Sequence, residues 1–149
     1  MTTPRPPVQP SSMLRPALAL LAGLGVTVLI VFVGVTITTL AALRGVDPKT
    51  YVAPFWTYPT HLIISFLGAV GGGFTTARIT TDHSLFTVVV LALILLMSAL
   101  TPVLRGVPGA PGQPSWYPLS LAVASVIGAL LGGVLERRPG RVTREPMET

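Results

Sequence analysis

The fold is decided by the stretch PALALLAGLGVTVLIVFVGVTITTLAAL, residues 16–43, in which 28 consecutive residues carry no charge. A helix rises about 1.5 Å per residue and the hydrocarbon core of a bilayer is about 30 Å thick, so roughly 20 apolar residues cross it. Three more stretches, residues 50–77, 84–104 and 106–135, also lack Lys, Arg, Asp and Glu. The sequence therefore predicts an all-α polytopic membrane protein. Its four transmembrane helices are expected at about 16–41, 60–79, 84–104 and 117–136.

The composition excludes the other broad classes. Half of the 149 residues are hydrophobic and only 10% are charged, whereas soluble domains carry roughly 25% charge. The apolar runs are continuous and do not alternate with polar residues, which excludes a membrane β-barrel. A cleaved signal peptide is the alternative for the first run, but its apolar core spans only about 7–15 residues. We therefore expect a retained helix.

The distribution of basic residues predicts the orientation. Seven lie on the side shared by the N-terminus, the second loop and the C-terminus: Arg5, Arg15, Arg78, Arg137, Arg138, Arg141 and Arg144. Three lie on the other side: Arg44, Lys49 and Arg105. The positive-inside rule then puts both termini in the cytoplasm. The Arg, Ala, Gly and Pro content is typical of a GC-rich bacterial gene, so the expected location is the inner (plasma) membrane. No helix face collects the basic residues into a phosphate-binding stripe, and nucleic acid is excluded as a partner.

The chain contains an internal repeat. The motif L-R-G-V begins at residues 43 and 104, and Trp56 and Trp116 follow at an offset of 60. The motif S-x-x-G-A-x-x-G-G then occupies residues 65–73 and 125–133. Each unit has two crossings, so we expect two parallel-repeat helical hairpins related by a pseudo-two-fold axis along the membrane normal. The whole chain forms one membrane domain, with units at about 16–79 and 84–138 and flexible tails at 1–12 and 139–149.

Small residues recur at every fourth position of the second and fourth helices, where that spacing keeps them on one face. We predict helix packing, not ligand binding, at these positions: Ser65, Gly68, Ala69, Gly72, Gly73, Ser120, Ala124, Gly128 and Gly132. Small faces let helix backbones approach closely in lipid. The hypothesis is that the second and fourth helices form the central contact. One alternative is that one small face serves a homodimer, and another is that the faces leave space for a substrate.

The sequence offers little chemistry. Residues 71–73 are three glycines, but they lack the Gly-Lys-Ser/Thr ending of a phosphate loop and lie within a predicted membrane helix. There is no cysteine, and the two histidines, His61 and His83, are expected on opposite sides of the membrane, so no catalytic, cofactor or metal site is predicted. Asp82 or Ser84 is expected to cap the third helix.

The deepest polar groups are hydroxyls, which can bond to their own helix: Thr36, Thr38, Thr39, Ser65, Thr75, Thr76, Ser98 and Ser125. The aromatic residues of the outer loops are expected to be interfacial anchors: Tyr51, Phe55, Trp56, Tyr58, Trp116 and Tyr117.

The motifs carry one resemblance. A Trp- or Tyr-Pro start, the block G-A-x-x-G-G and an Arg at the cytoplasmic end make residues 14–138 similar to the uncharacterised small four-helix membrane proteins of bacteria. The resemblance implies a four-helix fold and transfers no activity or site residue.

Three functional hypotheses remain. The favoured one is a non-catalytic structural or accessory subunit, which explains the lack of polar machinery. The alternative is a small oligomeric transporter or channel component, which explains the duplication and the small-faced helices. A membrane enzyme would lack an acid, a base, a metal and a nucleophile, so the protein is expected not to be an enzyme. The expected partners are the lipid bilayer and either further copies of the chain or another membrane protein.

Overall fold

The computed structural model describes residues 11–46, 52–80, 84–106 and 113–136, and these form four helices. The helices are α1 (Ser11–Ala42), α2 (Thr57–Ile79), α3 (Ser84–Leu104) and α4 (Tyr117–Glu136). The bounds of α3 and α4 agree with the expected spans. Helix α1 begins five residues and α2 three residues earlier than expected, because a helix need not end where its apolar stretch ends. Ser11 and Ser12, predicted as part of a flexible tail, therefore belong to α1.

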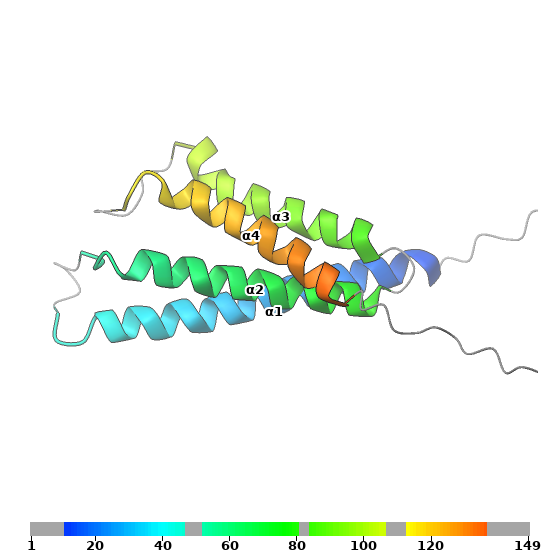
Figure 1. Ribbon diagram of the computed structural model, residues 1–149, viewed down its shortest axis with the longest axis horizontal. Coiled ribbons are helices and arrows are strands. Elements are labelled where there is room, and N and C mark those ends of the chain that lie inside the picture. The colour runs from blue at the N-terminus through cyan, green and yellow to red at the C-terminus, as the bar shows by residue number, and fades with distance from the viewer. Residues whose placement is uncertain (1–10, 47–51, 81–83, 107–112, 137–149) are drawn as a thin grey trace, which may run out of the picture.

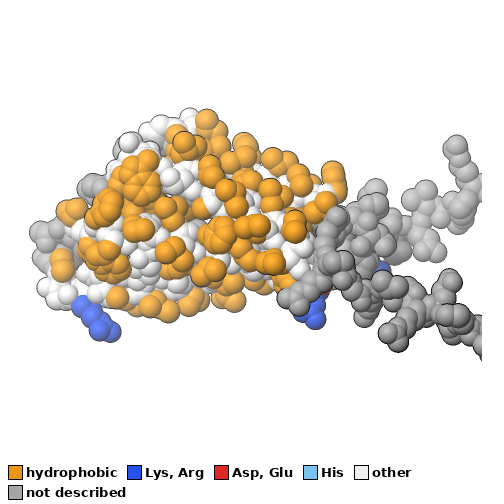
Figure 2. All heavy atoms as spheres, viewed as in Figure 1, with side chains coloured by type: hydrophobic (Ala, Val, Ile, Leu, Met, Phe, Trp, Pro, Cys, Tyr) orange, Lys and Arg blue, Asp and Glu red, His pale blue; other side chains and the backbone are white. Residues whose placement is uncertain are grey.

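All four helices are long and apolar enough to cross a membrane. Figure 2 shows hydrophobic side chains over the length of the visible face and basic side chains only near its two ends. Large apolar side chains stay exposed on the outside of the bundle, such as Phe32 at 67% and Phe86 at 73%. These observations define a multi-pass helical membrane protein, in which lipid would cover the exposed apolar faces.

The helices pack in the spatial order α1, α2, α4, α3 (Figure 1). The most extensive contact joins α2 to α4, followed by α1 with α2 and α3 with α4. Helix α3 also touches α2 and, slightly, α1, whereas α1 and α4 make no close backbone contact along their described lengths. Helices α2 and α4 therefore form the centre of the bundle, and the described parts of α1 and α4 are not in direct backbone contact.

Two local turns recur at equivalent places in the two hairpins. After α1 and after α3, the glycine of the L-R-G motif takes a positive φ, 78° at Gly45 and 63° at Gly106, a conformation that glycine adopts at helix C-termini without steric cost. Before α2 and α4, the Pro54 carbonyl accepts a hydrogen bond from the Thr57 N–H, and the Pro114 carbonyl accepts one from the Tyr117 N–H. The chain thus leaves the first helix of each hairpin through a glycine of positive φ and enters the second helix through a turn closed by a proline carbonyl.

Some sequence predictions fall outside the described residues: the Asp82 cap, the position of His83, the remaining tail residues and the Tyr51 anchor. The side chain of Ser84 is also not described.

Candidate functional site

The contact between α1 and α2 is built from two reciprocal pairs of glycine and threonine. A Cβ added at Gly23 would collide with Thr76 Oγ1, and one added at Gly72 would collide with Thr27 Oγ1. Either Cβ would also lie within 2.7 Å of the carbonyl oxygen of the other glycine. The Thr76 hydroxyl donates across the interface to the carbonyl of Ala19 at 3.3 Å. Glycine is required at both positions because each threonine occupies the space that a side chain would take.

The small residues that α1 contributes to this interface were not predicted from the sequence. Ala19, Gly23 and Thr27 follow the same spacing of four residues that marked the second and fourth helices. The signal was present, but Ala, Gly and Thr also recur elsewhere on this long apolar helix, including at Gly25, where an added Cβ would meet nothing within 4 Å.

The central contact between α2 and α4 brings backbone against backbone. A Cβ at Gly132 would collide with the Val70 carbonyl oxygen and lie 2.8 Å from the Phe74 nitrogen. A Cβ at Gly73 would collide with the Ala129 carbonyl oxygen. Real Cβ atoms essentially never approach heavy atoms below 3.0 Å, so these glycines allow a separation that no larger residue permits.

The N-terminal ends of α2 and α4 are joined by aromatic rings. Tyr58 and Tyr117 meet edge to face with ring centroids 5.3 Å apart and planes at 65°, a favoured aromatic geometry. Tyr58 is only 6% exposed. The expectation that Tyr58 is an interfacial anchor is therefore wrong, because the ring is needed to fill the space between the two central helices. Phe55, Trp56 and Trp116 are exposed at this end of the bundle.

Helices α2, α3 and α4 meet at a small apolar core. Ala69, Ala92 and Ala129 form its buried centre, with Leu95 and Val126 packed against them. A Cβ at Gly133 would lie 2.8 Å from a Val88 methyl group. Val88 and Leu91 are fully buried. The packing of α3 therefore uses larger side chains than the contact between α1 and α2.

The predicted packing residues divide among several surfaces. Gly68 and Gly72 face α1, whereas Gly73, Gly128 and Gly132 face the partner helix across the α2–α4 contact. Ser120 and Ala124 are half-buried and line a surface groove beside Phe66, Leu119, Val123 and Ile127. Ser65 lies on a cavity described below.

Sequence-equivalent glycines have different neighbours. Gly68 meets a Val31 methyl group of α1, whereas its equivalent Gly128 meets the Phe66 carbonyl oxygen of α2. A pseudo-two-fold axis would pair Gly128 with α3 instead. Helix α4 is thus turned about its own axis relative to α2, and the repeated motif serves two different contacts.

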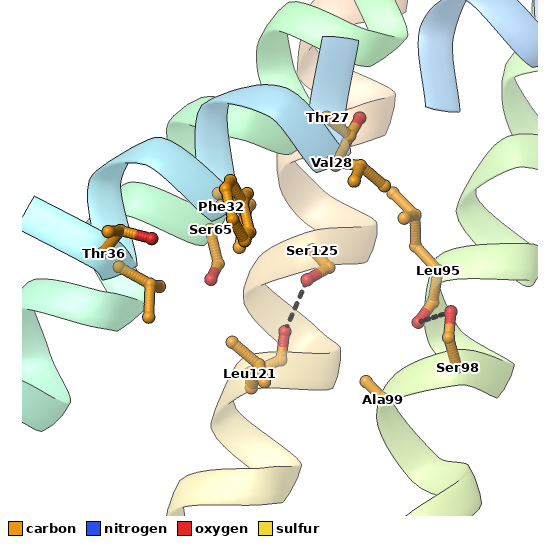
Figure 3. A pocket seen from close by; sticks show the side chains of 12 residues that line it. Thr27, Val28, Phe32, Thr36, Ser65, Leu95, Ser98, Ala99, Leu121 and Ser125 are labelled. Carbon is orange, nitrogen blue, oxygen red and sulfur yellow. Dashed lines mark hydrogen bonds between the residues drawn. The ribbon is translucent and has the colours of Figure 1, made fainter. Parts of the chain in front are cut away.

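A cavity of about 560 Å³ lies where α1 and α4 fail to meet. It is lined by Thr27, Val28, Val31, Phe32, Val35, Thr36, Ser65, Leu95, Ser98, Ala99, Leu121 and Ser125, which come from all four helices (Figure 3). Phe32 and Ser98 are exposed side chains on its rim, so the cavity opens on the side of the bundle. Its lining contains no Asp, Glu, Lys, Arg or His.

Most hydroxyls on the described helices bond to their own backbone. Thr38, Thr75 and Ser125 donate to the carbonyl four residues earlier at 2.8 Å, and Ser98 does so at 2.6 Å. Thr76 instead bonds to α1. Thr36, Thr39 and Ser65 make no hydrogen bond within the part of the chain that the structure describes.

The ionisable groups within the described helices and turns do not converge on a chemical site. Arg44 and Arg105 follow α1 and α3, and Arg78 and Glu136 lie in the last turns of α2 and α4 beside a shared surface pocket. His61 lies in the second turn of α2. Among the described residues no group of three His, Cys, Asp or Glu is arranged to hold a metal ion.

These features define a small polytopic helical membrane protein with glycine-mediated interfaces and a side-opening cavity. Comparisons with models of protein families, with curated proteins and with solved structures gave no match.

Proposed function

We propose that the protein is a non-catalytic membrane subunit that acts by presenting its helical surface to other molecules in the bilayer. The observation that carries this proposal is the placement of polarity. The ionisable side chains that the structure describes lie toward helix ends, and the polar groups in the middle of the helices are hydroxyls. Groups that move protons or ions through membranes are usually intramembrane carboxylates, histidines or basic residues.

The proposal includes the orientation and the repeat. The basic residues support cytoplasmic termini and a bacterial inner membrane. The recurring L-R-G turns and Pro-x-Trp starts support a common origin of the two hairpins, as does the resemblance to small four-helix membrane proteins. Equivalent glycines of α2 and α4 contact different helices, and this difference is compatible with a common origin. In a single chain, α2 packs between α1 and α4, so the two central helices need not make the same contacts.

The experiment is purification of the tagged full-length protein from its native membranes in a mild detergent. A membrane-protein partner that co-purifies in a fixed ratio, and that is lost when an exposed α1 residue such as Phe32 is changed to Trp, supports the subunit role. Recovery of the protein free of any stoichiometric partner, at several detergent concentrations and after cross-linking in intact cells, contradicts it.

The second candidate is a component of a small oligomeric transporter or channel. The cavity between the hairpins favours it, because it puts hydroxyls next to an opening at mid-helix depth. Purified protein in liposomes would then conduct ions or take up a solute, and Ala99→Leu, which adds bulk to the cavity lining, would reduce that flux. Liposomes that stay tight to ions and small neutral solutes argue against this candidate.

A further inference from the structure

The cavity between α1 and α4 contains a buried hydroxyl that the protein leaves unpaired. Ser65 is 7% exposed and lines the cavity, and its oxygen has no hydrogen-bond partner among the described residues. Figure 3 shows this hydroxyl directed into the open space, while Ser98 and Ser125 are bonded to their own helices. The Ser125 hydroxyl is already bonded to the Leu121 carbonyl, whereas the Ser65 hydroxyl keeps its donor available to a ligand.

This hydroxyl lies well inside a helix that is long and apolar enough to cross the bilayer. Ser65 and Ser125 are each the ninth residue of their helix, so they lie about 12 Å along the helix axis from its start. An unpaired hydroxyl is less favourable in hydrocarbon than in water. A bilayer molecule with a hydrogen-bonding oxygen at this depth would remove that cost.

Two more unpaired polar atoms continue the same face of α2 outward. Tyr58 Oη and His61 Nε2 are buried and have no hydrogen-bond partner in the described residues. Offsets of four and seven residues keep His61 and Tyr58 on the side of the helix that carries Ser65. Neither atom lines the cavity, so on this face of α2 the hydroxyl that can meet a ligand in the cavity is that of Ser65.

The chemistry of the lining restricts the ligand. Hydrocarbon side chains such as Val31, Leu95 and Leu121 form most of the wall, and no ionisable group lies in it. A charged ligand would pay a large desolvation penalty with no partner. The exposed rim at Phe32 and Ser98 offers access from the side, where lipid would lie.

We propose that this cavity is a binding site for an uncharged, largely hydrocarbon molecule of the bilayer that carries a hydrogen-bonding oxygen, with Ser65 as its polar contact. The site takes such a molecule sideways from the membrane. This inference goes beyond the proposed subunit role and does not rest on it, since a subunit, a transporter or an isolated protein could hold the same ligand.

The test uses photoreactive probes on the full-length protein in phosphatidylcholine nanodiscs. The probe is 1-hexadecanol carrying a diazirine at mid-chain. The matched probes are the diazirine alkane of equal length without oxygen and the corresponding fatty acid. Cross-linked residues are mapped by mass spectrometry over a range of probe concentrations, with unlabelled 1-hexadecanol as competitor. We expect saturable, competed labelling of the cavity walls on α1, α3 and α4 by the alcohol and only diffuse labelling by the other two probes.

Variants separate the site from the general lipid surface. Ser65→Ala removes the buried unpaired hydroxyl and should weaken the apparent affinity for the alcohol about two- to tenfold, the range for one neutral hydrogen bond. Thr75→Ala is the matched control, because its hydroxyl already bonds to the Gly71 carbonyl at 2.8 Å and it does not line the cavity. Ala99→Leu should impair saturable labelling by adding bulk to the cavity lining.

The proposal is overturned by any of three outcomes. Labelling by the alcohol that never saturates would show an ordinary lipid-facing groove. Equal saturation by the alkane would show that the cavity holds a bare hydrocarbon chain. An unchanged affinity in Ser65→Ala, with Ala99→Leu still impairing labelling, would show that Ser65 makes no contact with the ligand.

Discussion

Replacement of Gly132 by alanine is expected to push α4 away from α2. The new Cβ would lie 2.8 Å from the Phe74 nitrogen and closer still to the Val70 carbonyl oxygen, both of them backbone atoms. An ordinary contact begins near 3.4 Å, so the helices must separate by at least about 0.6 Å along this direction, and no side-chain rotation can relieve the clash. Overpacking of this kind costs about 1–3 kcal/mol. At roughly 2–4 °C per kcal/mol for a chain of this size, Tm should fall by roughly 2–12 °C.

Gly25→Ala is the control for this experiment. Gly25 also lies within a membrane helix, but an added Cβ there meets nothing within 4 Å, and alanine is a better helix former than glycine. Thermal unfolding of both variants is measured in the same detergent, with oligomer size followed by light scattering. Gly25→Ala should keep or raise Tm. If Gly132→Ala unfolds at the same temperature as Gly25→Ala, the close α2–α4 contact does not exist in the folded protein. If only the oligomer size changes, Gly132 contacts a second copy of the chain and not α2 of its own chain.

Further predictions address the repeat, the aromatic contact and the topology. Gly68→Ala should cost less stability than Gly128→Ala, because the first Cβ meets a Val31 methyl group and the second a backbone carbonyl; equal losses in thermal unfolding would instead favour true two-fold equivalence. Tyr58→Phe should leave Tm unchanged in detergent without added ligand, since the hydroxyl has no partner in the described structure, whereas Tyr58→Ala should cost about 3–5 kcal/mol through loss of the buried ring. In this cysteine-free chain, Val52→Cys should react with an impermeant thiol reagent on intact cells and Thr143→Cys should not; the reverse pattern would invert the topology.

The sequence alone was sufficient to predict four helices because the signal is local. Each charge-free run is long enough to cross a bilayer, and within hydrocarbon a helix satisfies its own backbone hydrogen bonds. The bounds of α3 and α4 could be predicted closely for this reason. Where polar residues continue a helix beyond its apolar part, as at Ser11 and Thr57, hydropathy contains no information about the end of the helix.

The neighbour of each small face was decided only by the tertiary structure. A spacing of four residues puts small residues on one side of a helix, but rotation of that helix about its axis determines which partner the side meets. The same G-A-x-x-G-G block therefore faces α1 from Gly72 and α2 from Gly132. The cavity has a similar origin. It exists because α1 and α4 do not touch, and the absence of a contact between two helices is a property of the whole packing, which no local pattern of residues encodes.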